Sequence, residues 1–181
     1  CYSCRDGKEN LCQNARYMAA TADGLARTLF LYPEERVIPV PEEVEVEVAA
    51  LTEPLSIVLN AFEEANLGLA DSVAVIGDGT IGYLLTLVIS HVGGIPPDRL
   101  YMIGIIDEKL SLARDFASTI NSIKETTKLS SIYGAIDVSF EAVGGKAHRV
   151  TIKEAIDLLK PGGRCILIGI SKGEVPVEVT K

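Results

Sequence analysis

The sequence lacks the features that define several large classes of protein. It has no cluster of basic residues, since 25 Asp and Glu outnumber 17 Lys and Arg and the net charge is −8, whereas nucleic-acid binding depends on clustered Lys and Arg. It has no apolar run near the roughly 20 residues that span a bilayer, and no signal peptide opens it. We therefore expect neither nucleic acid nor membrane as a partner, and a cytoplasmic location.

The chain also lacks an initiating Met. Residue 1 is Cys1, inside what reads as a motif, so the sequence is expected to be an internal piece of a longer protein. Hydrophobic residues make up 48% and charged residues 23%, which is typical of globular domains and not of disordered tails. The 181 residues allow one domain of ordinary size, or one plus a fragment.

Cysteine is scarce, yet three of the four cysteines lie close together, at Cys1, Cys4 and Cys12. Two thiolates two residues apart commonly begin a tetrahedral zinc site, although a redox pair is an alternative. Three cysteines cannot complete such a site, so we expect the fourth ligand just upstream and, in this chain, a lobe that is poor in metal or frayed. Cys165 stands alone in an apolar run and is expected to pack as a small hydrophobe.

The residue pattern in the first third of the chain predicts little regular secondary structure. Residues 29–32 and 37–40 are candidates for short strands among several prolines. The pattern of residues changes at Thr52. This residue can cap a helix, and the apolar residues that follow it fall on one helical face. We therefore expect two domains, a partial one over 1–50 and a second one over 51–181 that is truncated at its end.

From residue 72 onward, short apolar strands alternate with amphipathic helices. This alternation predicts an α/β fold in which a doubly wound parallel sheet carries helices on both faces. Helices are expected around 81–88, 108–117 and 152–159. The expected strands are 73–76, 100–103, 119–120, 136–140 and 165–170.

A glycine loop follows the first of these strands and opens the next helix. Its six residues are Gly77, Asp78, Gly79, Thr80, Ile81 and Gly82. In this context Gly77 permits a tight turn, Gly79 lets a pyrophosphate approach the backbone, and Gly82 lets the helix pack close to the strand. The helix N-terminus would then face the phosphates. A glycine-rich turn without a ligand is the alternative.

The end of the second strand bears on the choice of dinucleotide. A carboxylate there would bind the adenosine ribose and favour NAD, but the residue leaving the strand is Gly104. A glycine leaves room for a 2′-phosphate, for which Lys109 or Arg114 could supply the cation, so NADP is expected and NAD is the alternative. If the strand is slightly longer, Asp107 would take the ribose instead.

Together these motifs resemble the medium-chain zinc-dependent alcohol and polyol dehydrogenases, in their sorbitol-dehydrogenase-like branch. The cysteine loop resembles the last three ligands of that family's structural zinc lobe. The cofactor-domain segments follow in the family's order: 51–56, 77–82, 141–145 and 161–169. Gly104, the pattern Gly77-Asp-Gly-x-x-Gly-Tyr83 and the segment 174–178 together resemble the NADP-dependent ribulose-5-phosphate reductases, several of which lack the cysteine lobe.

The resemblance implies a Rossmann-type cofactor domain and hydride transfer between NADP, or NAD, and an alcohol, polyol or sugar-alcohol phosphate. It implies that Gly144 and Gly169 also contribute to the cofactor site, and that Glu53 is a carboxylate of the catalytic zinc site. The other ligands of that zinc, a Cys and a His, would lie upstream, because His91 and His148 are both expected to be solvated or at a helix end. We therefore expect this chain to be inactive by itself and its parent to be a homo-oligomer.

Two alternatives come from other classes. A methyltransferase that uses S-adenosylmethionine also has a glycine loop after its first strand, although the cysteine loop and Gly104 disfavour it. A dinucleotide-sensing domain without catalysis is the second alternative.

Overall fold

The computed structural model describes residues 1–177, so Glu178, the last residue of the segment 174–178, lies outside the described residues. The chain divides into two compact units, Cys1–Val44 and Glu45–Lys181. This division falls after residue 44, a few residues before the expected boundary after residue 50.

The first unit contains only short helical elements. They are α1 (Tyr2–Arg5), η1 (Glu9–Leu11) and η2 (Glu34–Arg36). The expected strands at 29–32 and 37–40 are wrong, since the only β pairing described within residues 1–44 is one isolated bridge. Leu31 and Ile38 are 102% and 88% exposed, so neither segment has a partner strand or a core to pack against. Strand propensity without a packing partner does not make a strand.

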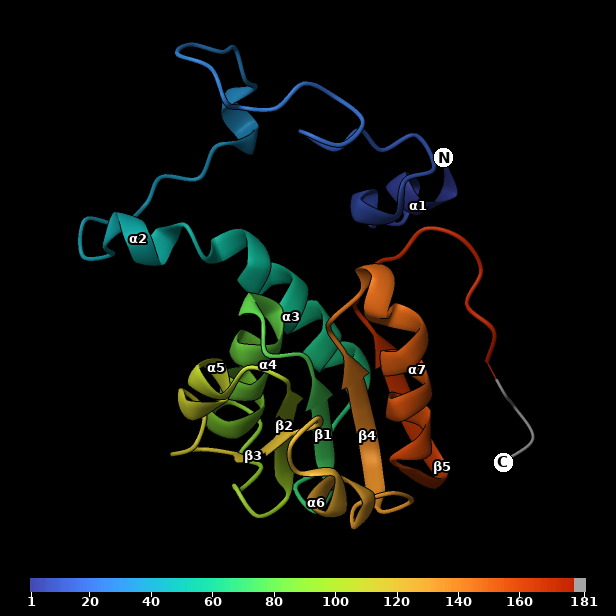
Figure 1. Cartoon of the computed structure of the whole chain (residues 1–181). Helices are drawn as coiled ribbons and strands as arrows, with labels where there is room; N and C mark the ends of the chain where they lie inside the picture. The colour runs from blue at the N-terminus through green and yellow to red at the C-terminus, as the bar shows by residue number, and fades with distance from the viewer. Residues whose placement is uncertain (178–181) are drawn as a thin grey trace. The chain divides into compact units, whose positions relative to one another are not determined.

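The second unit is an α/β domain with a five-stranded parallel sheet, as Figure 1 shows. The strand order is β3-β2-β1-β4-β5. This order and direction confirm the expected Rossmann-type, doubly wound fold. Its elements are α2 (Val46–Ala49), α3 (Thr52–Ala65), β1 (Val73–Ile76), α4 (Thr80–His91), β2 (Leu100–Gly104), α5 (Asp107–Ser111), β3 (Ser118–Asn121), α6 (Thr126–Ser130), β4 (Ile136–Glu141), η3 (Gly145–Ala147), α7 (His148–Asp157) and β5 (Leu159–Leu167).

Strand β1 is buried on both faces, and its side chains alternate between two cores. Val73 and Val75 join a cluster with side chains of α3 and α4, whereas Ala74 and Ile76 join a second cluster with side chains of α6 and α7. A strand that is covered on both sides reads as a continuous apolar run. This is why the run at 73–76 identified the central strand.

Two boundaries differ from the sequence-based expectation for local chemical reasons. Thr52 does not cap α3: Leu51 is the N-cap, and the Thr52 hydroxyl donates to the Ala49 carbonyl at 2.7 Å. Strand β5 begins at Leu159 and includes Pro161, whereas the strand was expected only from residue 165. Pro161 is tolerated there because β5 is an edge strand whose register with β4 shifts at this point.

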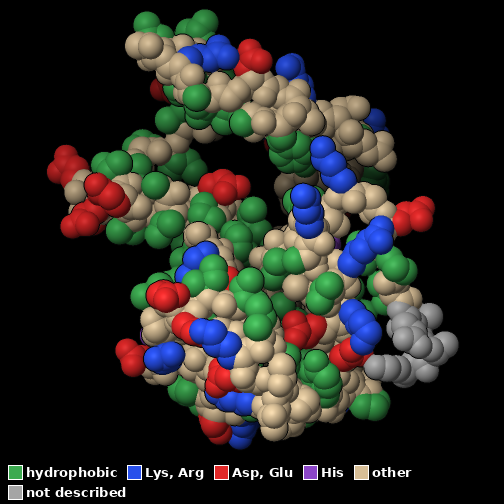
Figure 2. Space-filling view, in the orientation of Figure 1, with side chains coloured by type: hydrophobic (Ala, Val, Ile, Leu, Met, Phe, Trp, Pro, Cys, Tyr) green, Lys and Arg blue, Asp and Glu red, His purple; other side chains and the backbone are tan. Residues whose placement is uncertain are grey.

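The visible surface of the second unit carries charges of both signs in alternation, as Figure 2 shows. No helix within residues 1–177 is long and apolar enough to cross a membrane.

The packing of α4 against the end of β1 generates the first prediction. A Cβ atom on Gly82 would lie 1.9 Å from the Gly77 carbonyl oxygen, so Gly82→Ala must displace backbone. We expect this variant to lose about 1–3 kcal/mol or more of unfolding free energy in chemical denaturation. Gly79→Ala is the matched control, because its Cβ would meet no atom within 4 Å. Equal stability of the two variants would contradict this packing.

Candidate functional site

The glycine loop lies where the sheet changes its winding direction. Strand β1 pairs with β2 on one side and with β4 on the other, and in doubly wound sheets ligands bind at the carboxyl ends of two such strands. Gly77 has φ +132°, and a Cβ on it would lie 3.1 Å from the Ala142 carbonyl group. Only glycine satisfies both the conformation and the close approach of the loop after β4.

The next residues of the loop leave an open approach to a helix N-terminus. Gly79 is exposed and Thr80 begins α4, whose first N–H groups have no acceptor inside the helix. The half-buried Ile81 packs against the core instead. This arrangement offers N–H groups and the positive end of a helix dipole to an anion.

Two cavities flank the loop. The larger cavity, about 280 Å³, is lined by Gly79, Thr80, Tyr83 and Lys109 among others, so an ammonium group stands beside the helix N-terminus. The smaller cavity, about 130 Å³, is lined by residues from the loops after β1, β2 and β4 and from α7. Its Glu154 carboxyl has a raised pKa because the group is buried and Asp157 lies near it. Asp78 lines both cavities.

The end of β2 differs from the expectation in one respect. The strand ends at Gly104, as expected, but the space beside this glycine is filled. A Cβ on Gly104 would lie 2.5 Å from the Asp78 Cβ and 2.6 Å from its Oδ2. The interpretation that Gly104 leaves room for a 2′-phosphate is therefore corrected, because the Asp78 side chain occupies that room.

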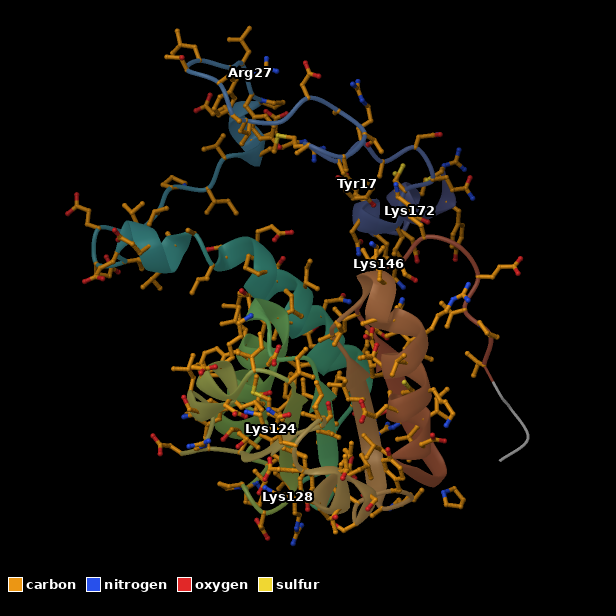
Figure 3. The ribbon with its side chains drawn as sticks, viewed as in Figure 1. Tyr17, Arg27, Lys124, Lys128, Lys146 and Lys172 are labelled. Atoms are coloured by element: carbon orange, nitrogen blue, oxygen red, sulfur yellow. The ribbon has the colours of Figure 1, made fainter. Side chains whose placement is uncertain are left out.

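Asp107 does not take the strand-end position. It is the first residue of α5, and its carboxylate is held by the last residue of β3 and by the loop that follows. Oδ1 accepts from the Asn121 amide at 2.6 Å, and Oδ2 pairs with Lys124, which Figure 3 labels. The hydrogen bond from Lys124 and then that from Asn121 lower the pKa of Asp107. Arg114, the other candidate cation, is exposed and lies beyond α5.

Glu141 is a buried carboxylate that the sequence analysis did not single out as a functional residue. It ends β4 and is 0% exposed. Its Oε1 accepts from the N–H groups of Val143 and Gly144 at 3.1 Å each and from the Thr151 hydroxyl at 2.6 Å. Its backbone carbonyl accepts from the N–H groups of residues 168 and 169. Glu141 thus forms hydrogen bonds to the loops after β4 and β5 and to helix α7.

The same cluster contains His148, whose expected solvation is wrong. The ring is 6% exposed, with Nε2 3.0 Å from Glu141 Oε2 and Nδ1 2.7 Å from the Ser171 hydroxyl. Gly144 and Gly169 face each other here, since a Cβ on Gly169 would lie 2.4 Å from the Gly144 nitrogen. His148 and Ser171 are 23 residues apart in sequence, so no local pattern could reveal this contact. His91, by contrast, is exposed at the end of α4.

Glu53 lies in the first turn of α3 and is exposed. Within residues 1–177, the only cluster of three or more His, Cys, Asp or Glu that could hold a metal does not include it. Glu53 is therefore not part of a metal-binding cluster among these residues.

That cluster consists of Cys1, Cys4 and Cys12. The Cys1 sulfur lies 3.6 Å from that of Cys4 and 3.8 Å from that of Cys12, and four sulfurs bound tetrahedrally at about 2.3 Å lie about 3.8 Å apart. A hydrogen bond from the Asn14 N–H lowers the pKa of Cys12, whereas the hydrogen bond with Cys12 raises that of Cys4. The donors and their spacing fit zinc. Cys165 is half-buried in β5, and burial raises the pKa of its thiol.

Curated proteins similar to this chain are dehydrogenases and reductases of polyols and sugar phosphates. An L-idonate 5-dehydrogenase from Vitis vinifera is 28% identical and covers 99% of this chain. Ribulose-5-phosphate reductase 2 from Staphylococcus aureus is 29% identical and covers 94%. The chain spans about half the length of these relatives, 50% and 48%. No family model matches the chain.

Solved structures give the same result. A protein described as a short chain alcohol dehydrogenase, from Escherichia coli CFT073 and in complex with NADH, superposes with a TM-score of 0.83 at 27% identity, covering 98% of this chain and 52% of its own. A zinc-binding dehydrogenase from Sinorhizobium meliloti bound to NADP has a TM-score of 0.81 at 25% identity, covering 98% and 53%. The resemblance to medium-chain alcohol and polyol dehydrogenases, which the motifs indicated, is confirmed.

The Glu141 cluster generates a stability prediction. Thr151→Val removes the hydroxyl that donates to the Glu141 carboxylate without changing the side-chain shape, and we expect a loss of about 1–3 kcal/mol in unfolding free energy. Thr127→Val, at an exposed position of helix α6, is the control and should change it by less than about 0.5 kcal/mol. Chemical denaturation measures both, and a neutral Thr151→Val would contradict the role of this bond.

The cysteine cluster generates a prediction about zinc. Three thiolates leave one position of a tetrahedron without a protein ligand among the described residues, so we expect less than one tightly held zinc ion per chain by elemental analysis. In titration against a chromophoric chelator, Cys12→Ser should weaken zinc binding at least about tenfold, and Cys165→Ser should leave it unchanged. One tightly held zinc per purified chain would count against the first expectation.

Proposed function

We propose that this chain, a relative of the medium-chain zinc-dependent alcohol and polyol dehydrogenases, is the cofactor-binding part of such an enzyme. The parent transfers hydride between NAD or NADP and an alcohol, polyol or sugar-alcohol phosphate. The named substrates of its relatives, idonate and ribulose 5-phosphate among them, support this class. Structures of similar chains with NADH and with NADP support the cofactor.

The glycine loop is the observation that carries this proposal. Gly77 and Gly82 are excluded from bearing a side chain by close contacts, whereas Gly79 has open space around it. A loop that only needed to turn would not require an exposed glycine at its centre. The open glycine beside a helix N-terminus is the geometry that a pyrophosphate needs.

Different residues of this chain bind different parts of a dinucleotide. The first turn of α4 binds the pyrophosphate, and Lys109, from the larger cavity, adds a positive charge to it. Glu141 fixes the loops after β4 and β5, where Gly144 and Gly169 keep the backbone free of side chains. When bound, a nicotinamide ring would accept or donate the hydride, and these loops would hold the dinucleotide.

A catalytic zinc does not follow from the described residues. Glu53 is the one residue proposed for it, and no Cys or His of residues 1–177 joins Glu53 in a metal cluster. Activation of the alcohol therefore needs ligands that these residues do not bring together. Zinc is proposed here only for the three cysteines, in a structural role.

Some expectations remain predictions. They are the homo-oligomeric state of the parent, its cytoplasmic location, and the absence of nucleic-acid and membrane partners. The acidic net charge of −8 supports the expectation about nucleic acid.

The test combines binding and turnover. The purified chain should quench or enhance the fluorescence of NADH or NADPH on binding, and Gly79→Ala should weaken binding at least about tenfold without changing stability. S-adenosylmethionine should not compete. No alcohol should be oxidised by the chain alone, because residues 1–177 bring together no second ligand cluster that could hold a catalytic zinc. Failure of both dinucleotides to bind, or turnover by the chain alone, would contradict the proposal.

A further inference from the structure

The loops after β4 and β5 are joined to each other at the carboxyl ends of their strands. The Gly145 N–H donates to the Ile170 carbonyl at 2.8 Å. The Gly169 N–H donates to the Glu141 carbonyl at 3.0 Å. The loop after β5 therefore takes its position from the end of β4 and from the loop that follows it.

Two side chains at the start of α7 hold the same loop further along. His148 Nδ1 lies 2.7 Å from Ser171 Oγ. The Arg149 guanidinium donates to the Glu174 carbonyl at 3.2 Å. Ile170 is 87% exposed, so polar contacts fix the loop here and the burial of that side chain does not.

The contact with Glu141 decides which nitrogen of His148 carries the proton. Nε2 lies 3.0 Å from Glu141 Oε2, and although the two are not aligned as a hydrogen bond, neither buried atom has another partner among residues 1–177. Two buried acceptors would repel each other at this distance, so the proton belongs on Nε2. In the neutral ring Nδ1 is then the acceptor, and the Ser171 hydroxyl donates to it.

The two sides of the sheet face different halves of a dinucleotide. In doubly wound folds the pyrophosphate lies at the glycine loop after the first strand, and the adenosine ribose lies at the end of the second strand. The other half of the ligand then lies over the strands on the opposite side of β1, which here are β4 and β5. The loop that His148 holds is therefore on the side of the nicotinamide riboside.

We propose that His148 is a positioning residue, which through Ser171 holds the loop after β5 in place for the nicotinamide half of the dinucleotide. The inference rests on the proposed function and names a residue that serves it without touching the ligand. Glu141 orients the buried imidazole, the imidazole accepts from Ser171, and the loop contacts the ligand. The 2′-phosphate belongs to the adenosine half, so the proposal holds equally for NAD and NADP.

Binding of a whole dinucleotide and of its adenosine half separates positioning from folding. The purified chain is titrated with NADH or NADPH, whichever it binds more tightly, and with ADP, which has no nicotinamide riboside. Ser171→Ala should weaken dinucleotide binding at least about fivefold and leave ADP binding within about twofold of wild type. Ser130→Ala, at an exposed position of α6, is the matched control and should change neither.

Two substitutions of His148 separate its contacts. His148→Leu removes both nitrogens and should weaken dinucleotide binding at least about tenfold, with ADP binding within about threefold of wild type. His148→Asn keeps an oxygen near the place of Nδ1 for the Ser171 hydroxyl, and should restore dinucleotide binding to within about threefold of wild type. Equal weakening by Leu and Asn would overturn the proposal, because the contact with Ser171 would then be irrelevant.

Hydrogen exchange tests the position of the loop without any ligand. The Gly145 amide reports on the loop after β5, because it donates to the Ile170 carbonyl. In Ser171→Ala its exchange should accelerate at least about threefold relative to that of Val75 in the buried strand β1. An unchanged ratio of the two exchange rates would overturn the proposal.

The possible failures are distinguishable. If wild type binds neither dinucleotide, the proposed function is wrong and this inference with it. If wild type binds a dinucleotide, but Ser171→Ala and His148→Leu weaken ADP binding as much as dinucleotide binding, the role of His148 is structural only. In that case, and also if both variants bind the dinucleotide as wild type does, the positioning proposal is wrong while the proposed function stands.

Discussion

The close approach of α4 to the carbonyl of Gly77 is the contact on which the rest of the site depends. Because Gly82 has no side chain, the first turn of the helix lies directly against the end of β1. This contact points the helix N-terminus at the edge of the sheet where β1 and β4 separate. The anion site, both cavities and the reach of Asp78 toward β2 all follow from that placement.

Around this contact the two halves of the sheet are held by buried or half-buried carboxylates that bind backbone N–H groups. Asp78 fixes the loop after β2, and Glu141 fixes the loop after β4. Each carboxylate belongs to a residue at or just after a strand end, so its side chain spans the gap to a neighbouring loop. The loops that would surround a dinucleotide are therefore preorganised, which reduces the ordering cost of binding.

The sequence predicted the features that depend on local pattern. Strands β1, β2 and β4 were identified because buried strands are short apolar runs between turn residues. The glycine loop was identified because each glycine has a position-specific steric reason. The strand end at Gly104 followed from the start of the next helix at Asp107.

The remaining features depend on contacts between distant residues, which no local pattern reports. Asp78 and Ile106 are 28 residues apart, and nothing in the glycine loop indicated that its acid would fill the space beside Gly104. The burial of His148 depends on Ser171 and Glu141. In the first unit the prediction was wrong for another reason. The apolar residues at 29–32 have a local strand pattern, but the fold provides no partner strand for them.

The ion pair between Asp107 and Lys124 contributes to the corner after β2 over a wide pH range. The pKa of Asp107 is lowered from 3.8 by Lys124 and Asn121, so its contribution is present above that value and is lost as the pH falls through the lower folded pKa. The pKa of Lys124 is raised from 10.5 by Asp107, so its contribution is lost only as the pH rises through the higher folded pKa. The pair is unchanged between these limits, whereas a phosphate monoester gains its second charge near pH 6. A pH dependence of 2′-phosphate recognition in the neutral range therefore belongs to the ligand and not to this ion pair.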